Sequence, residues 1–181
     1  MIEAFSDGCC RKEGKGGWGI LIYIDNEILI AGSYADRVTN NMMELQGPIE
    51  ILDRLTIFNE ENKQVKITSD SSYFVDGFNQ WMHGWEKKGW RKHPTKPDGG
   101  IANLDMWKKL FDMKFNRNIK ASWVRGHSGH YENEICDAIA NKCCGYRQQI
   151  FGMVPNTYQL SPMALDQFLQ PNITEVNINF S

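Results

Sequence analysis

Three runs of hydrophobic residues at the start of the chain predict three β-strands. Residues 1–7 alternate between apolar and polar positions, whereas residues 18–25 and 27–35 are rich in Ile, Leu and Tyr. The pair Asp25-Asn26 between the last two runs is typical of a tight turn, so these two strands are expected to form a hairpin. A glycine-rich turn over residues 8–17 connects the first strand to this hairpin.

The next hydrophobic pattern has the helical period. Residues 39–58 place apolar side chains three or four positions apart, which predicts a helix with one face on the sheet. Asn40 or Asn41 is expected as the N-cap, because a short polar side chain accepts a hydrogen bond from a free amide of the first turn. Pro48 lacks an amide hydrogen and presses on the carbonyl of Glu44, so a kink or a loosened first turn is expected.

The rest of the chain alternates strands with helices. Residues 64–70 form a short β-branched run that predicts a fourth strand, and residues 119–124 predict a fifth. Helices are predicted over residues 71–82, 103–115 and 133–144, the last stopped by Gly145. Together these elements indicate an α/β fold, with five strands in a mixed sheet and helices packed on it.

Length and composition narrow the class of protein. A chain of 181 residues suits one domain with or without an appendage, and 12% aromatic content is ordinary for a folded chain. No stretch approaches the roughly 18 apolar residues of a spanning helix, and the N-terminus does not have a signal-peptide pattern. The five cysteines are odd in number and form no CxxC motif, which favours reduced thiols over disulfides or a zinc site. A cytoplasmic protein without membrane contact is expected.

Four acidic residues stand where the predicted strands end or the predicted helices begin. Asp7 and Asp70 end two strands, Glu44 opens one helix and Asp137 lies early in another. Such ends share one edge of an α/β sheet, so the four carboxylates can converge there. Taken singly, each acid is better explained as a helix N-terminal or turn residue. As a set, oxygen ligands without His or Cys favour Mg²⁺ or Mn²⁺, and two such ions about 4 Å apart are suited to phosphodiester hydrolysis.

A basic segment contrasts with this acidic set. Residues 85–97 carry five Lys or Arg against the single acid Glu86, in a chain of net charge −2. In isolation such a run is most simply a solvated surface. Trp81, Trp85 and Trp107 offer flat apolar surfaces next to these charges, which is a pattern suited to a nucleic acid backbone. Some of these tryptophans must belong to the core, and Trp81 is expected to be the one that contacts a ligand.

The motifs of the chain resemble those of type 1 ribonuclease H, the family that cuts the RNA strand of RNA/DNA hybrids. The matching segments are "FSDGCC", "GGWG", "TNNMMEL", "ITSDSSYFVDGFNQWMHGWEKKGW", "NLDMWKKL" and "WVRGHSGHYENEICDAIA", in the order of the family. The resemblance implies a ribonuclease H-like fold with a five-stranded mixed sheet whose first three strands are antiparallel. It also implies two Mg²⁺ ions, with Mn²⁺ as an alternative, held by Asp7, Glu44, Asp70 and Asp137. His127 would move protons or ease product release, and the product would carry a 5′-phosphate.

The same resemblance assigns residues to substrate binding. Polar side chains of "TNN" would contact 2′-hydroxyls, base edges and a phosphate, Cys10 would contact the RNA strand, and the basic segment would be a protrusion that holds the DNA strand. The substrate-binding residues expected on this ground are Cys10, Thr39, Asn40, Asn41, Ser72, Trp81, Lys87, Lys88, Arg91 and Lys92. Three positions depart from the usual family pattern. Glu13 replaces an Asn near the RNA, Ser72 replaces a Gln, and Pro48 follows Glu44.

The domain prediction follows from the extent of the resemblance. Residues 1–145 are expected to form the catalytic domain, with the protrusion around residues 81–97, and residues 146–181 to form an extension that packs on the domain or binds a protein partner. Within the extension, a helix is predicted over residues 163–170 and a strand over residues 176–180. A monomer that binds an RNA/DNA hybrid is expected. Two alternatives remain, a hybrid-binding module without catalysis and a related two-metal DNA nuclease or resolvase.

Overall fold

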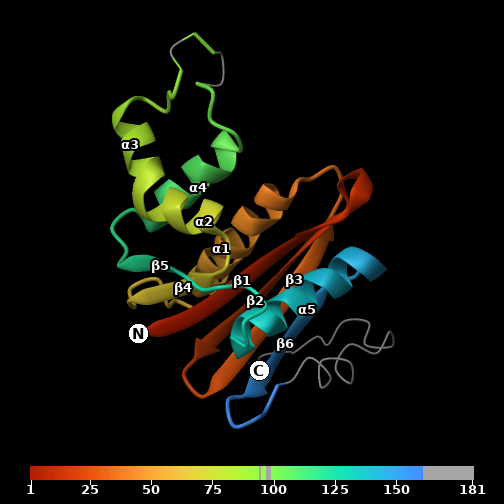
Figure 1. The fold of residues 1–181 in the computed structure, drawn as a ribbon. Coiled ribbons are helices and arrows are strands. Elements are labelled where there is room, and N and C mark those ends of the chain that lie inside the picture. Colours follow the sequence, from red (N-terminus) through yellow and green to blue (C-terminus); the bar gives the residue numbers. More distant parts are fainter. Residues whose placement is uncertain (94, 97–98, 161–181) are drawn as a thin grey trace.

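A six-stranded mixed sheet forms the centre of the fold (Figure 1). The computed structural model describes residues 1–93, 95–96 and 99–160. The sheet has the order β5-β4-β1-β2-β3-β6. Its elements are β1 (Ile2–Cys10), the short helical turn η1 (Lys12–Gly14), β2 (Gly16–Ile24), β3 (Glu27–Ala35), α1 (Asn40–Ile57), β4 (Val65–Ser69), α2 (Ser72–Asp76), the π-helical turn η2 (Gly77–Trp81), α3 (Met82–Lys87), α4 (Leu104–Lys114), β5 (Ile119–Trp123), α5 (Tyr131–Tyr146) and β6 (Ile150–Pro155).

Strand pairing follows the predicted topology for the first five strands. β1, β2 and β3 pair in an antiparallel manner, and the hairpin turns at Asp25 and Asn26 as expected. β4 pairs parallel with β1, and β5 pairs parallel with β4. The parallel strands therefore direct their C-terminal ends to one edge of the sheet, where the loops that follow them meet.

Helices cover both faces of the sheet, which explains why its strands are continuously hydrophobic. On one face, α1 packs on the sheet, and residues of α1, α2 and α4 share the larger core cluster with strand residues such as Ile20 and Leu29. On the other face, α5 packs against neighbouring positions such as Leu21 and Ile30. Because adjacent residues of a strand point to opposite faces, a run such as residues 20–22 supplies both cores at once.

The prediction of five strands is wrong by one, because the segment after α5 adds β6 to the edge of β3. β6 runs antiparallel to β3, from Gly32 opposite Ile150 to Glu27 opposite Pro155. Ile150 and Val154 are buried against the α5 side of the sheet. The segment "IFGMVP" contains Gly and Pro, which weaken a strand pattern, so its pairing is decided by the exposed edge of β3 and by burial. The helix and strand predicted over residues 163–170 and 176–180 lie outside the described residues.

The helical segment after β4 is longer than predicted. Residues 72–87 form three successive pieces, α2, η2 and α3, where a single helix over residues 71–82 was expected. A Cβ atom on Gly77, at the start of the π-helical turn, would lie 2.1 Å from the ring of Trp107. Only a residue without a side chain lets α4 approach this closely, so Trp107 is fully buried between the two helical segments.

Two helix ends also differ from the sequence predictions. Thr39 is the N-cap of α1, because its Oγ1 accepts a hydrogen bond from the amide of Met42, where Asn40 or Asn41 was expected. The helix continues through the buried Pro48 to Ile57. α5 ends at Tyr146 with Arg147 in the left-handed conformation, so Gly145 is not the stop. None of the described helices combines the length and the apolar character that crossing a membrane requires.

Candidate active site

Three carboxylates meet where β1, α1 and β4 come together. Asp7 lies within β1, Glu44 lies near the start of α1, and Asp70 directly follows β4. One oxygen from each side chain lies within 4.8 Å of the others, and we call these three residues the acidic cluster. Phe5 of β1 pairs with Thr68 of β4, so two residues further along the parallel strands Asp7 lies beside Asp70. The strand predicted to end at Asp7 continues to Cys10.

Two glycines let the backbone approach the acidic cluster closely. A Cβ atom on Gly8 would lie 2.6 Å from the amide nitrogen of Glu44, so α1 packs directly on the backbone of β1. A Cβ atom on Gly126, in the loop after β5, would lie 2.3 Å from Oδ2 of Asp70. A side chain at Gly8 would overlap with the backbone of α1, and one at Gly126 would force the Asp70 carboxylate to shift, so both glycines allow the observed spacing of the carboxylates.

The electrostatics of the acidic cluster are unfavourable for three free carboxylates. Burial raises the pKa of Asp7 to about 8, with a further contribution from repulsion by Asp70 and Asp137. Burial likewise raises the pKa of Glu44 to about 9, with repulsion from Asp7 and Asp70. Asn40 donates a hydrogen bond to Oε1 of Glu44 at 3.2 Å, whereas the buried Oε2 accepts none.

The acidic cluster therefore fits a hard divalent cation. Buried carboxylates that lie close together are stable only when they are protonated or when a cation neutralises them. The buried Oε2 of Glu44, which has no hydrogen-bond partner, is free to bind such a cation. All three side chains offer oxygen, which Mg²⁺ and Mn²⁺ prefer over nitrogen or sulfur. Asp7, Glu44 and Asp70 are the residues that could hold such an ion.

Asp137, the fourth predicted carboxylate, lies next to the acidic cluster on α5 but is not one of its three members. It is half-buried, and burial followed by repulsion from Asp70 raises its pKa, while His127 and a hydrogen bond from Asn141 act in the opposite direction. Asn141 donates this bond to Oδ1 of Asp137 at 2.7 Å. The carboxylate of Asp137 thus faces both the acidic cluster and His127.

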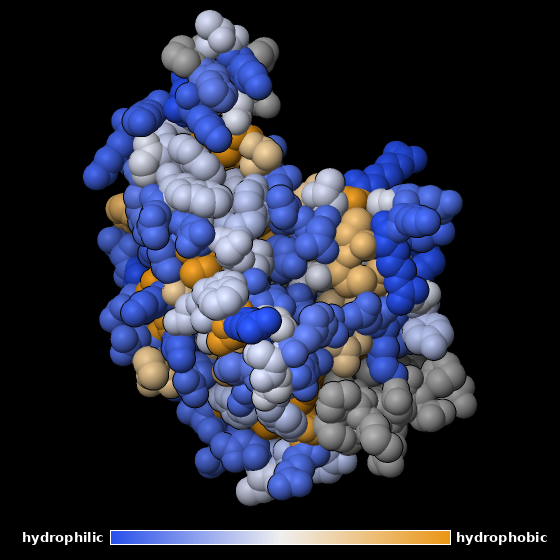
Figure 2. Space-filling model, viewed as in Figure 1, coloured by the Kyte–Doolittle hydropathy of each residue, from blue (hydrophilic) through white to orange (hydrophobic). Residues whose placement is uncertain are grey.

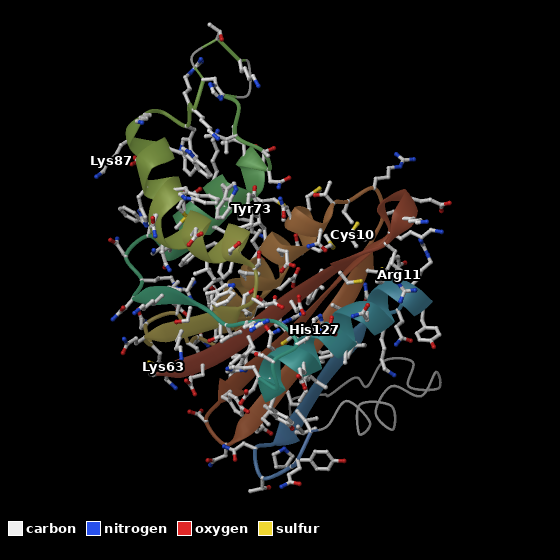
Figure 3. The ribbon with its side chains drawn as sticks, in the orientation of Figure 1. Cys10, Arg11, Lys63, Tyr73, Lys87 and His127 are labelled. Carbon is white, nitrogen blue, oxygen red and sulfur yellow. The ribbon has the colours of Figure 1, made fainter. Side chains whose placement is uncertain are left out.

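His127 lies in the loop between β5 and α5 (Figure 3), and its side chain is exposed. Its backbone adopts a left-handed conformation with a φ of 49°, which is rare for a residue with a side chain. The loop therefore has a specific conformation at this position, and it presents the imidazole to solvent beside the carboxylates.

The predicted minor-groove residues lie on the N-terminal end of α1 and on β1. Thr39, Asn40 and Asn41 are all exposed. The hydroxyl of Thr39 caps the helix and the amide of Asn40 contacts Glu44, so the structure assigns local partners to two of the three. Cys10 is half-buried, and its thiol donates to the carbonyl of Val38 at 3.4 Å, which joins the end of β1 to the segment before α1.

Two of the departures from the family pattern have structural consequences. Ser72 is exposed at the first position of α2, two residues after Asp70, so its short side chain is accessible. Glu13 points to solvent with 77% of its side chain exposed, and it pairs with Lys15 at 3.1 Å.

The basic segment extends from the end of α3 away from the body of the protein. Lys87 ends α3 and Lys88, Arg91 and Lys92 follow it, all four exposed. Figure 2 shows mainly hydrophilic residues over this projection, and Figure 3 places Lys87 on it, well away from Cys10. The described part of the basic segment is thus available to a large ligand.

A groove of about 530 Å³ lies between α3 and the segment that precedes α4. Its lining includes the rings of Trp81 and Trp85, with Lys88 and Lys92 beside them. The exposed fraction of Trp81 is 38%, whereas Trp107 is fully buried, so Trp81 is more accessible than Trp107. Tyr73 also lines this groove, with its ring centroid 6.0 Å from that of Trp81.

Three residues of the site were missed by the sequence predictions. Tyr73 accepts hydrogen bonds from Asn103 and Trp107, contacts that no local pattern indicates. Gly126 stands in a glycine-punctuated loop, but only the tertiary structure shows that its backbone touches Asp70. Asn141 lies four residues after Asp137, and this helical spacing is a signal that could have identified it.

The fold and the acidic cluster define an α/β protein with a carboxylate site at the edge of a mixed sheet. A model of the RNase H family matches residues 1–144. Ribonuclease H of Syntrophotalea carbinolica is 41% identical over 143 residues, which cover 78% of this chain and 90% of that protein. The chain belongs to the ribonuclease H family.

Solved structures agree with this family assignment. The structure of LC9-RNase H1, a type 1 RNase H with the type 2 active-site motif, is 30% identical with a TM-score of 0.71, over 85% of this chain and 76% of that one. LC11-RNase H1 in complex with an RNA/DNA hybrid is 19% identical with a TM-score of 0.60, over 81% of this chain and 98% of that one, and this likeness concerns the fold.

Proposed function

We propose that this chain is a metal-dependent endonuclease that hydrolyses the RNA strand of RNA/DNA hybrids. The observation that carries the proposal is the acidic cluster, in which burial and mutual repulsion raise the pKa values of Asp7 and Glu44. Membership of the ribonuclease H family supports the substrate, as does the RNA/DNA hybrid bound by LC11-RNase H1.

Asp7, Glu44, Asp70 and Asp137 are the residues proposed to hold two Mg²⁺ ions, with Mn²⁺ as a possible replacement. When bound, such ions supply a Lewis acid that polarises the scissile phosphate and lowers the pKa of an attacking water. Asp7 and Glu44 are rigid because they are buried, and Asn40 fixes one oxygen of Glu44. This rigidity would hold the reacting phosphate in one position relative to the carboxylates.

His127 is proposed to move protons at the edge of the site. An imidazole nitrogen can accept a proton from water and donate one to a leaving oxygen. Its exposed position beside Asp137 supports a role that includes product release. The products would be a 5′-phosphate and a 3′-hydroxyl.

Substrate binding is proposed to use two surfaces on either side of the acidic cluster. Cys10, Thr39, Asn40, Asn41 and Ser72 would contact the minor groove, where 2′-hydroxyls distinguish RNA from DNA. Trp81 would stack beside the sugar and phosphate backbone of the DNA strand, and Lys87, Lys88, Arg91 and Lys92 would neutralise its phosphates.

The organisation of the chain is also part of the proposal. Residues 1–145 would carry the catalytic activity as a monomer, and residues 146–181 would support the domain or bind a partner, with β6 in the part of this segment that the structure describes, residues 146–160. All five cysteines are free thiols, which supports a reducing cytoplasmic location.

Replacement of Asp70 by Asn tests the proposal directly. Asp70→Asn keeps the size of the side chain but removes a negative charge from the acidic cluster, so cleavage of a labelled hybrid in Mg²⁺ should be lost while hybrid binding remains. Asp25→Asn, in the exposed turn between β2 and β3, is the matched control and should cleave normally. Cleavage by Asp70→Asn at the normal rate would contradict the proposal. Parallel assays on duplex DNA and duplex RNA distinguish a DNA nuclease, which would cut the former.

A further inference from the structure

Asp137 is held in place differently from the acidic cluster. Asp7 and Glu44 are almost fully buried, and Asp70 packs against the backbone of Gly126. Asp137 is only half-buried on α5, so packing alone does not fix the direction of its carboxylate. A carboxylate that is to bind a metal ion with the others needs another source of rigidity.

Asn141 supplies contacts of this kind from the next turn of α5. Its Nδ2 donates to Oδ1 of Asp137 at 2.7 Å and to the carbonyl oxygen of Asp137 at 3.0 Å. Residues four apart lie on the same face of a helix, so this contact is intrinsic to α5. Because one carboxylate oxygen is engaged by the amide, the other is the oxygen that Asn141 leaves for a cation.

Asn141 is itself fixed by β1 and by the turn that follows it. The thiol of Cys9 donates to Oδ1 of Asn141 at 3.3 Å, and the guanidinium of Arg11 donates to its backbone carbonyl at 3.4 Å. The amide orientation follows from these partners, since its NH₂ group faces a carboxylate and its oxygen faces a thiol hydrogen. A chain of contacts thus runs from Cys9 through Asn141 to Asp137.

We propose that Asn141 is a positioning residue that holds the Asp137 carboxylate in the orientation required for metal binding. This inference rests on the proposed function, because it takes Asp137 as a metal ligand. Hydrogen-bond partners of metal ligands typically change metal affinity about 10-fold to 100-fold when they are removed. A purely structural role, in which Asn141 ties α5 to β1, would change stability and leave metal affinity unaltered.

The test is calorimetric titration of the full chain with Mn²⁺ in the absence of substrate. Asn141→Ala is expected to raise the Kd for Mn²⁺ by about 10-fold and to raise the metal concentration for half-maximal hybrid cleavage by a similar factor. Asn62→Ala is the control, because Asn62 is exposed before the N-terminal end of β4, at the opposite edge of the sheet. If far-UV circular dichroism shows that Asn141→Ala is unfolded, Asn141→Ser replaces it, with a side chain too short to reach the carboxylate.

A second substitution separates positioning from a general effect on the fold. In an Asp137→Asn background, Asn141→Ala should cause no further change in Kd, because its target is already neutral. An unchanged Kd for Asn141→Ala alone, or losses that multiply in the double variant, would overturn the inference. If Asp137→Asn itself leaves Mn²⁺ binding and cleavage unchanged, the ligand assignment of Asp137 fails and the inference fails with it. An effect of Asp137→Asn without one of Asn141→Ala rejects the positioning role alone.

Discussion

At the scale of single residues, the geometry of the site depends on two glycines, which have no side chain. Gly8 and Gly126 bring backbone atoms to distances at which a methyl group would overlap with Glu44 and Asp70, respectively. The acidic residues themselves are recognisable in the sequence, because strand ends and helix starts in an α/β pattern converge. The glycines that set their spacing are not recognisable in the same way, since their requirement comes from segments far apart in the chain.

Substitution of Gly126 should therefore impair catalysis more than folding. In Gly126→Ala, the new methyl group would overlap with Oδ2 of Asp70 and push this oxygen away, and a shift of about 1 Å at a catalytic group costs on the order of 100-fold in rate. The kcat of hybrid cleavage is expected to fall by about this factor, with little change in thermal unfolding because the displaced atom is the end of the Asp70 side chain and not backbone. Gly84→Ala on α3 is the control, since its methyl group meets nothing within 4 Å. Equal rates for the two variants would show that Asp70 is not constrained by Gly126.

At the scale of elements, local patterns identified most helices and strands, but they did not identify which further segments pair with the sheet or pack on the helices. The helical period and the β-branched runs placed α1, β4, α4 and β5 correctly to within a few residues. β6 was missed because "IFGMVP" has a weak strand pattern and forms only where the edge of β3 accepts it. No helix was predicted beyond residue 82, because the following residues belong to the basic segment, whereas in the structure α3 continues to Lys87 and Trp85 packs on Trp107 with ring centroids 5.7 Å apart.

The projection that begins at α3 makes a prediction about substrate affinity. Lys87 and Lys88 are exposed, so their replacement by Ala should raise the KM for the hybrid and leave kcat nearly unchanged. Each lost phosphate contact reduces the dependence of log K on log salt by about one, because fewer counterions are released. Measurement of KM between low and high salt checks both expectations.

A matched pair of lysines provides the control for this experiment. Lys63 and Lys66 lie at the N-terminal end of β4, and Figure 3 shows Lys63 well away from Lys87. Lys63→Ala with Lys66→Ala therefore removes the same charge elsewhere. A similar rise of KM in both double variants would indicate a general charge effect. A collapse of kcat in the Lys87 and Lys88 variant would show that the projection does more than bind.

At the scale of the whole molecule, an acidic site and a basic projection coexist in a chain of net charge −2. The separation lets the same protein concentrate cations at one place and attract phosphates at another. In the absence of metal the acidic cluster destabilises the folded state when its carboxylates are ionised, because burial opposes the ionisation of Asp7 and Glu44.

This cost of ionising buried carboxylates predicts how the stability of the metal-free protein depends on pH. The pKa of Asp7 is raised to about 8 in the folded protein, above its ordinary value near 3.9 in an unfolded chain, so the folded state holds a proton that the unfolded state releases. Its contribution to stability is complete below about pH 4 and is lost as the pH rises through about 8. Asp7→Asn does not titrate, so in EDTA at pH 9 it should be more stable than the natural protein by about 1–3 kcal/mol.

Urea unfolding at pH 5, 7 and 9 measures this difference, and Glu3→Gln on the exposed side of β1 serves as the control. Saturating Mg²⁺ should reverse the order at pH 9, because an ion that binds only the folded natural site stabilises it. A difference between Asp7→Asn and the natural protein that does not change with pH would show that burial leaves the pKa of Asp7 unaltered.

The sequence by itself determined the class of fold, the family and the identity of the candidate ligands. These follow from local information, since hydrophobic periodicity, turn residues and the spacing of Asp7, Glu44, Asp70 and Asp137 are properties of short segments. The tertiary structure decided the rest. It added β6 to the sheet, grouped three carboxylates tightly with Asp137 beside them, and joined Cys9, Asn141 and Asp137 from β1 and α5. Such contacts depend on how closely distant segments pack, which no local pattern records.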